Sequence, residues 1–410
     1  MDILSMINSG EIKDTENKRK LVVDGNPKLY NIYYIPINLL YYNDQNGRIS
    51  TRMQKYTSEG HSVNKNDVDA YNRIIEDFIV QSKKDRFEIT KADIKDKGLQ
   101  NPIIILRDGR VIDGNRRFSC FRQLNREYPK NEEFQTIEAI VLDYDMSTSR
   151  DRQIIKLLEI EKQFGEDKIV EYDVIDELTD MYNTIVVEKL LDEKQYAKIS
   201  KMSLQVIKQK IKEAGVMFDF LEFINQPEKT YIANEMKLDG PLNEIVQILS
   251  KENDTTQKEQ LKNALFAEMI ACRNSDITRG LRDKKDMIKS GDINNYIEKS
   301  NELVIEVLDT ISKYDNLTTD DLGREFAPDN KTQMEFVDIN DSIMRKIKYR
   351  KAKQEPLSIL KSVVDKINIF DIDVLQYLDG DTLDNLEQIL IEIEENCTEI
   401  KRSINSVKRL

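Results

Sequence analysis

The stretch from Gly98 to Leu124 constrains the fold of this chain more than any other. It reads GLQNPIIILRDGRVIDGNRRFSCFRQL. An apolar, mostly β-branched run at 103–106 precedes the turn signal Asp108-Gly109, and apolar residues resume at 111. After a break at Asp113-Gly114-Asn115, the apolar residues take helical spacing. The stretch therefore predicts a β-hairpin, a tight turn and a helix.

Two adjacent arginines, Arg116 and Arg117, fall in the first turn of that predicted helix. A helix N-terminus carries about half a positive charge and disfavours cations there. Backbone N–H groups, a glycine that permits close approach and two guanidinium groups together suit an anion, above all a phosphate. The alternative is that Asn115 caps the helix and both arginines are simply solvated.

GLQNPIIIL followed by VIDGNRR resembles the ParB/sulfiredoxin superfamily, which has a Gly-x-x-x-Pro loop before one strand and a Gly-x-(Arg/His)-Arg turn after the next. Sulfiredoxins carry their catalytic cysteine where this chain has Asn115, so sulfinic-acid reduction is not expected. The resemblance implies an α+β ParB/sulfiredoxin-like domain that binds a nucleoside triphosphate, CTP or ATP. The residues implied in binding are Gly98, Gln100, Asn101, Gly114, Asn115, Arg116 and Arg117.

The same resemblance points to further site residues. Arg48, in an Asn-Gly-Arg element after the first strand, is expected to face the phosphates, although an exposed arginine in a hairpin turn is the alternative. Glu159 and Glu161 lie where ParB proteins have a Glu-Asn-x-Gln-Arg box, and either is a candidate ligand of Mg²⁺. Surface glutamates on a helix are the alternative. In an enzyme, Asp113 or Glu161 would position the attacking water or hydroxyl.

Composition limits the remaining possibilities. At 410 residues the chain predicts several domains, which we place at 1–145, 146–225 and 226–410. Three distant cysteines and one histidine argue against zinc and against Ser-His or Cys-His catalysis. The sequence contains no membrane-length apolar run and no secretory signal, which predicts a soluble, cytoplasmic protein. The net charge of −13 argues against indiscriminate coating of nucleic acid.

Several segments carry their own secondary-structure signals. We expect strands at 32–37 and 136–142, a helix at 66–83, and a short helix from a capping box at Thr90 to Gly98. Pro36 suggests that the first of these strands lies near a sheet edge. From residue 149 onward the pattern is helical almost without interruption, so the α+β domain is followed by a mostly α-helical region.

Residues 192–224 resemble a helix-turn-helix. Tyr196, Ala197 and Ile199 mark the first helix, and Ser203 would cap the second, with Val206, Ile207 and Ile211 facing inward. Six lysines against three acids over 192–215 make this segment locally basic. A structural helical hairpin is the alternative. The residues expected to contact DNA are Ser203, Gln205, Lys208, Gln209 and Lys212.

The C-terminal residues show a 4-3-4-3-4-3 apolar spacing, which is typical of a heptad seam. It predicts either a homodimer or packing within the chain, and the helical C-terminal region could also bind a protein partner. The seam consists of Leu386, Leu390, Ile393, Cys397, Ile400, Ile404 and Val407.

The leading hypothesis is a ParB-like, nucleotide-dependent DNA-binding protein acting in partition, regulation or phage defence. The main alternative is an enzyme of the same fold, an NTPase, nuclease or phosphotransferase. A third possibility is an interaction protein whose pocket no longer binds nucleotide.

Overall fold

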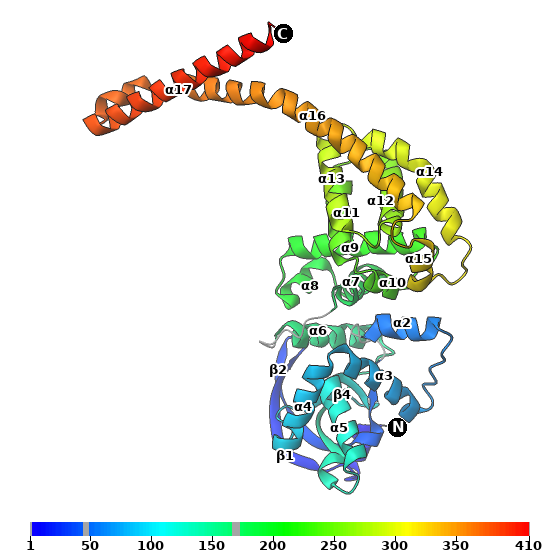
Figure 1. Ribbon diagram of the computed structural model, residues 1–410. Helices are drawn as coiled ribbons and strands as arrows, with labels where there is room; N and C mark the ends of the chain where they lie inside the picture. Colours follow the sequence, from blue (N-terminus) through cyan, green and yellow to red (C-terminus); the bar gives the residue numbers. More distant parts are fainter. Residues whose placement is uncertain (1, 44–48, 166–172, 410) are drawn as a thin grey trace. The chain divides into compact units, whose positions relative to one another are not determined.

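The computed structural model describes residues 2–43, 49–165 and 173–409. Its N-terminal part is built on one mixed six-stranded sheet with strand order β1-β2-β6-β4-β5-β3 (Figure 1). Short β-branched and aromatic runs separated by glycine turns favour these strands. The strands are β1 (Asp14–Val23), β2 (Asn26–Pro36), β3 (Tyr41–Tyr42), β4 (Ile103–Leu106), β5 (Arg110–Asp113) and β6 (Thr136–Leu142).

The sheet contains both antiparallel and parallel strand pairs. β1 pairs antiparallel with β2 and β2 with β6, and β4 pairs antiparallel with β5. β4 runs parallel to β6, with Ile103 opposite Ala139, and β3 runs parallel to β5, with Tyr41 opposite Arg110. All four residues of β4 are buried, as expected of a strand covered on both faces.

Helices cover both faces of the sheet. Buried side chains of α3, α4 and α5 pack with Ile103, Ile105 and Val111 on one face. On the other face, Ile154, Ile155 and Leu158 of α6 pack against the alternate strand residues, among them Ile104 and Ile112. The helices of this part are α1 (Ile3–Asn8), α3 (Val68–Ser82), α4 (Lys84–Lys97), α5 (Asn115–Glu127) and α6 (Ser149–Gly165), with 3-10 turns η1 (Ile37–Leu39) and η3 (Glu132–Phe134).

A helical region follows α6 (Figure 1). A cluster of apolar side chains from the end of α6 and from α7, α8 and α9 forms its first core. Its elements are α7 (Val174–Tyr182), the π-helix η4 (Asn183–Val187), α8 (Glu193–Ser200), α9 (Leu204–Phe223), α10 (Thr230–Glu235), α11 (Asp239–Leu249), α12 (Thr255–Ala271), α13 (Ile277–Lys289), α14 (Ile293–Ile311) and α15 (Thr319–Glu325).

Helix α2 (Ser50–Ser58) joins the sheet-containing part to the helical region. The Gln54 side-chain oxygen accepts hydrogen bonds from the Thr230 backbone N–H at 3.1 Å and from its hydroxyl at 2.7 Å. The Ser58 hydroxyl bonds the Tyr231 hydroxyl at 3.1 Å. Thr230 is fully buried, so these bonds belong to a packed contact between α2 and α10.

A buried polar network ties the later helices of this region together. The Lys284 ammonium, fully buried, lies 2.7 Å from one Glu268 oxygen and donates to the Asn340 amide oxygen at 2.8 Å. The Asn340 amide donates to Glu268 at 2.8 Å, and the Tyr296 hydroxyl also donates to that carboxylate. A buried ion pair is tolerated when its remaining hydrogen-bonding groups are satisfied in this way.

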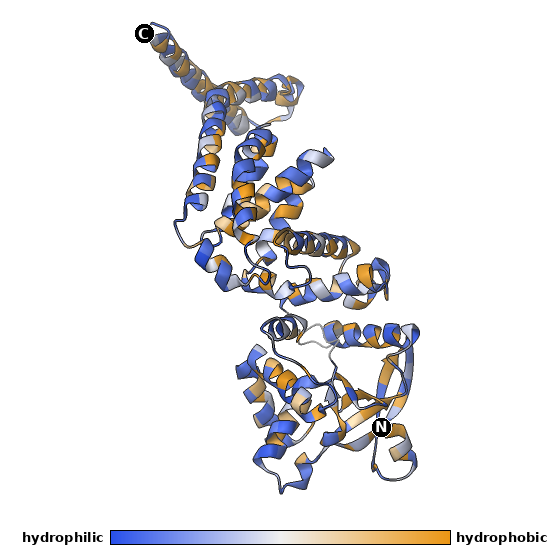
Figure 2. Cartoon of the chain, turned by 90° about the vertical axis from the view of Figure 1, so that its right-hand side faces the viewer, coloured by the Kyte–Doolittle hydropathy of each residue, from blue (hydrophilic) through white to orange (hydrophobic). Residues whose placement is uncertain are grey.

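The chain divides into two compact units, residues 1–343 and 344–410. The second unit contains the last part of α16 (Lys331–Asn368), the 3-10 helix η5 (Ile372–Tyr377) and α17 (Gly380–Val407). It keeps many large apolar side chains exposed, and α17 alternates apolar and polar residues (Figure 2). The three-domain division at 145 and 225 stays a proposal.

The coarse fold prediction is confirmed, because a mixed sheet is followed by a mostly helical remainder. The predicted strands, the helix at 66–83 and the end of α4 at Gly98 are also confirmed. Two details were wrong. β2 lies inside the sheet between β1 and β6, with Pro36 as its last residue. α4 begins at Lys84, and the Thr90 hydroxyl donates to the Arg86 carbonyl within the helix instead of capping it.

None of the helices in the described part of the chain combines the length and the apolar character needed to span a bilayer.

Candidate functional site

The predicted hairpin, turn and helix form a compact corner at the end of β5. Gly109 has φ +92° and Gly114 has φ +97°, a region that favours glycine. A Cβ on Gly114 would lie 2.5 Å from the Cγ2 of Ile103, so the turn is also pressed against β4. Gly114 is the N-cap residue of α5, and Arg116 and Arg117 therefore lie in its first turn as predicted.

Arg117 joins the two parts of the predicted site. One of its terminal nitrogens donates to the backbone carbonyls of Asn101 at 2.7 Å and Pro102 at 3.0 Å. The other donates to the Asp113 carboxylate at 2.8 Å. Arg117 thus fastens the loop that follows Gly98 to the turn that follows β5. In this geometry Arg117 and Asp113 hold the loop and the turn together, and their predicted roles in phosphate binding and catalysis stay predictions.

The loop itself is anchored at both ends. Gly98 closes α4 with φ +72°, and its N–H donates to the Ile94 carbonyl at 2.9 Å. The Gln100 amide donates to the Lys97 carbonyl at 2.9 Å, while the Asn101 side-chain oxygen accepts from Arg19. Arg117 therefore holds Asn101 and Pro102 against the turn, and Gly98 and Gln100 lie in the loop just before them.

Two residues of the first turn of α5 are candidates for direct contact with a bound phosphate. Asn115 and Arg116 are half-buried. Among the described residues, the Asn115 side-chain oxygen is buried and has no hydrogen-bond partner. A flip of the side-chain amide would place the nitrogen there instead, because the oxygen and nitrogen are assigned from the hydrogen-bond network. An amide group can donate hydrogen bonds through its nitrogen and accept them through its oxygen.

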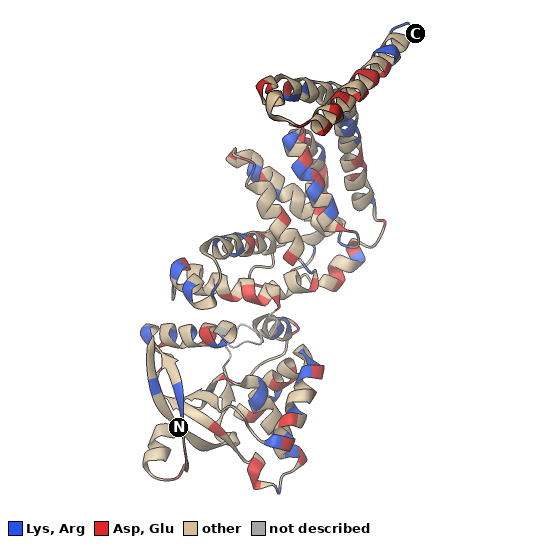
Figure 3. Cartoon of the chain, turned by 90° about the vertical axis from the view of Figure 1, so that its left-hand side faces the viewer, with Lys and Arg blue, Asp and Glu red and all other residues tan. Residues whose placement is uncertain are grey.

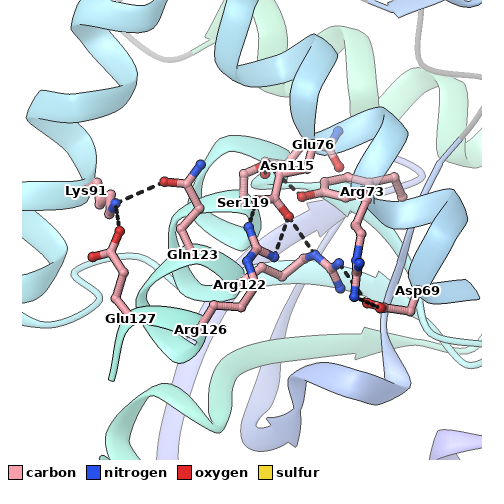
Figure 4. Close-up of polar contacts among 11 residues, drawn as sticks. Asp69, Arg73, Glu76, Lys91, Asn115, Ser119, Arg122, Gln123, Arg126 and Glu127 are labelled. Atoms are coloured by element: carbon pink, nitrogen blue, oxygen red, sulfur yellow. Dashed lines mark hydrogen bonds and ion pairs between the residues drawn. The ribbon is translucent and has the colours of Figure 1, made fainter. Parts of the chain in front are cut away.

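A charged network that sequence reasoning missed holds α5 against α3, on the helix face that also carries Asn115 (Figure 4). Arg122 donates to Glu76 of α3 at 2.8 Å and to Asp69 at 3.1 Å, and Arg126 also pairs with Glu76. Glu76 and Arg122 are buried, so the pair fixes the rotation of α5 against α3. The sequence signal is that Asp69 and Glu76 share one face of α3, seven residues apart.

Glu159 lines a cleft of about 180 Å³ between α6, the segment after β3 and the π-helix η4. Its carboxylate accepts from the Asn43 amide at 2.9 Å and lies 3.8 Å from the Lys156 ammonium. Lys156 also pairs with Asp180. Burial alone would lower the pKa of Lys156, but these two carboxylates together raise it.

The predicted metal ligands do not form a closed site. Glu161 is exposed, whereas Glu159 faces the cleft. No group of three or more His, Cys, Asp or Glu side chains suited to a metal ion occurs within the described residues. Because the Lys156 ammonium already lies beside Glu159, a divalent cation there would need further oxygen ligands, which a triphosphate carries. Arg48 lies outside the described residues.

The two helices predicted within residues 192–224 are present as α8 and α9, and a DNA-binding role for them stays a prediction. α8 begins with a capping box at Asp192, and Lys201 adopts the left-handed conformation, with φ +60°, between the helices. The Ser203 hydroxyl caps α9 by accepting from the Val206 N–H at 3.3 Å. Tyr196 is 1% exposed, so the pair has a packed interior.

The outer face of α9 differs from the prediction at two positions. Gln205, Lys208 and Lys212 are exposed. Gln209 was expected to face outward, but its amide donates to Glu213 at 3.0 Å and Asn243 at 3.4 Å, because α9 continues for 20 residues and packs beside α11. Val206 was expected to face inward and is 42% exposed.

Comparison with known proteins gives little further guidance. No protein-family model matches the sequence, and no curated protein matches it. Among solved structures, the chain is similar to the C-terminally truncated chromosome-partitioning protein ParB from Caulobacter crescentus complexed with CTP-gamma-S. The identity is 12%, the match covers 53% of this chain and 92% of that chain, and the TM-score is 0.19. A TM-score this low supports no inference about the fold or ligand of this chain.

Proposed function

We propose that this chain is a ParB-like protein that binds a nucleoside triphosphate, CTP or ATP. The triphosphate binds at the corner formed by the Gly98 loop and the first turn of α5, and its binding governs the contact of the chain with DNA. The observation that carries the proposal is the link made by Arg117, which holds the loop carbonyls of Asn101 and Pro102 against this turn. The sequence resemblance supplies the ligand class.

The physical case rests on charge at the start of α5. The partial positive charge of a helix N-terminus favours an anion, and its first-turn N–H groups point outward along the axis. Asp113 pairs with Arg117. We assign the phosphate contact to Arg116 because it lies in the first turn of α5, next to the helix N-terminus. A charge-assisted hydrogen bond contributes roughly 1.5–3 kcal/mol.

Calorimetric titration of the full chain with CTP, ATP, GTP and UTP in the presence of Mg²⁺ tests the proposal. Arg116→Ala is expected to weaken triphosphate binding by at least about tenfold, the equivalent of one charge-assisted hydrogen bond. Arg86→Ala, at an exposed arginine of α4, is the matched control and should bind like the wild type. The proposal fails if no triphosphate binds, or if Arg116→Ala retains full affinity. Phosphate release in the same samples tests the enzyme alternative.

Arg117 and Arg116 are distinguishable by a second measurement. Arg117→Ala should weaken binding and also speed amide hydrogen exchange in residues 98–102, because it removes the two bonds to the loop carbonyls. Arg116→Ala should leave exchange in the loop unchanged. Equal exchange in both variants would contradict the positioning role of Arg117.

We assign DNA contact to the start of α9, because Ser203 opens the helix and Lys208 and Lys212 are exposed on it. Lys208 lies 3.7 Å from Glu193, an exposed pairing that DNA phosphates can replace. The double variant Lys208→Ala, Lys212→Ala should flatten the salt dependence of DNA binding by about two units. An unchanged slope would remove α9 from the interface. Gln205→Ala should change sequence preference with little effect on the slope.

The same proposal includes a homodimer formed through the seam of α17. Leu390 is 56% exposed and Ile404 is 45% exposed within one chain. A second copy that covers this stripe would remove those side chains from water, at roughly 25 cal/mol for each Å² of apolar surface.

A further inference from the structure

The last part of α16 carries a concentrated positive charge that the proposed function does not use. Between Asp341 and Glu355 the sequence contains six cations and no acid. All six are exposed on a continuous helix, within the unit 344–410. They are Arg345, Lys346, Lys348, Arg350, Lys351 and Lys353.

The six cations lie close together compared with the distance over which salt screens a charge. Six cations in nine residues span about 12 Å of helix at a rise of 1.5 Å per residue, and the Debye length at physiological salt is about 8 Å. Lys346, Arg350 and Lys353 are spaced four and three residues apart, so they form one stripe. Like charges at this spacing destabilise an isolated helix, and a bound polyanion would relieve that repulsion.

The charges elsewhere in the chain argue that residues 345–353 are not an ordinary solvent-exposed helix face. Such a face usually mixes both signs, whereas residues 345–353 carry cations only and α17 carries seven acids and no cation from Asp381 to Glu399 (Figure 3). The whole chain carries a net charge of −13, so this stretch is a local exception within an acidic protein. Within the same helix, Ile343 and Ile347 are buried, at 0% and 1% exposure.

We propose that residues 345–353 bind the phosphate backbone of duplex nucleic acid as a second contact surface, separate from α9. Duplex DNA carries one negative charge for about every 1.7 Å of its axis, which a helix with cations at this density can follow. Arginine adds bidentate pairing with phosphate oxygens.

The composition of the segment favours nucleic acid over an anionic membrane. A helix that lies in a membrane surface needs an apolar face opposite its cations. Here Ile347 is buried, and Tyr349, at 64% exposure, lies under the Lys353 ammonium at 4.6 Å from the ring centroid. Pro356 lies three residues after Lys353, between the basic segment and the exposed apolar residues further along α16.

The test is fluorescence anisotropy of a labelled 30-bp duplex with the full chain over a range of salt concentrations. The variant Lys346→Gln, Arg350→Gln, Lys353→Gln should flatten the salt slope by about three units, at about 0.9 unit per phosphate contact. If the two proteins bind equally at 1 M salt, this difference in slope makes the variant bind about two hundred times more weakly at 0.15 M salt. A melt followed by circular dichroism checks that the variant is folded.

A control with the same change in net charge separates local contact from overall charge. Lys237→Gln, Lys299→Gln, Lys313→Gln alters three exposed lysines elsewhere and should leave the slope unchanged. The proposal is overturned if the α16 variant binds like the wild type, if both triple variants lose affinity equally, or if the wild type binds no duplex. Binding to phosphatidylserine vesicles without binding to the duplex would instead assign a membrane surface. The α9 lysine variant, measured in parallel, shows independently whether the helix-turn-helix contributes.

Discussion

Asp176 of α7 gives the chain a pH-dependent contact at the start of α2. Its side chain is 4% exposed and hydrogen-bonds the backbone and hydroxyl of Thr51, in the first turn of α2. Burial raises the pKa of Asp176 to about 7, against 3.8 for the free side chain. The nearby Asp173 carboxylate adds to this rise.

The sign follows from proton binding. Between pH 4 and pH 7 the folded chain holds a proton on Asp176 that the unfolded chain has lost, so stability falls as the pH rises. The contribution of this group is fully present below its unfolded pKa of 3.8 and is lost as the pH rises through about 7. At 1.36 kcal/mol per unit, the loss between pH 5 and pH 8 is about 3 kcal/mol.

Comparison with Asp176→Asn isolates this term, because titration of the other groups cancels in the difference. The two proteins should be about equally stable at pH 5, and the variant should be more stable by roughly 3 kcal/mol at pH 8. Urea unfolding followed by circular dichroism, with hydrogen exchange of α2 as a local measure, checks this. Asp173→Asn keeps the side-chain oxygen that caps α7 and should move the midpoint to lower pH. A difference that stays constant from pH 5 to pH 8 would refute the reasoning.

Three further changes have expected outcomes. Gly114→Ala should lower the free energy of unfolding by about 2–3 kcal/mol in a thermal melt and abolish nucleotide binding, because it combines a positive φ with a 2.5 Å clash. Gly98→Ala has no atom within 4 Å of the new Cβ and should lower it by about 1 kcal/mol. Lys284→Met should destabilise the helical region by about 3–5 kcal/mol in urea unfolding, because it leaves a buried carboxylate without its cation. Ile393→Asp with Ile400→Asp should yield a folded monomer by sedimentation, and a wild type that is monomeric at high concentration would exclude the dimer.

Local signals were enough to predict the corner of the site. The Asp108-Gly109 turn, β4 and the start of α5 are each encoded within a few residues, and the structure confirms them. β1 was missed because DTENKRK is polar and lacks alternation. It is the sheet's terminal strand, and its partner β2 pairs with it from Asp14 to Val23. An edge strand needs fewer apolar residues than a central one, so its sequence signal is weak.

Tertiary contacts decided what the sequence left open at the site. Nothing in the letters Arg116-Arg117 distinguishes the two arginines. Arg117 is distinguished by its hydrogen bond to the Asn101 carbonyl, which lies sixteen residues earlier in the chain. A contact distant in sequence also sets the rotation of α9 about its own axis, because Gln209 hydrogen-bonds Asn243 of α11, 34 residues away. A helical periodicity fixes which residues share a face, and a distant partner determines where that face points.

Helix α2 connects these observations. Arg48, the predicted phosphate contact, precedes the start of α2 at Ser50 by two residues in the sequence. The first turn of α2 meets the Asp176 carboxyl, and Gln54 bonds Thr230 of the helical region. A nucleotide that shifts the start of α2 would therefore alter the surroundings of Asp176 and the contact with α10 together. Linkage makes that coupling reciprocal, so the proton on Asp176 and the nucleotide must each change the affinity of the other by the same factor.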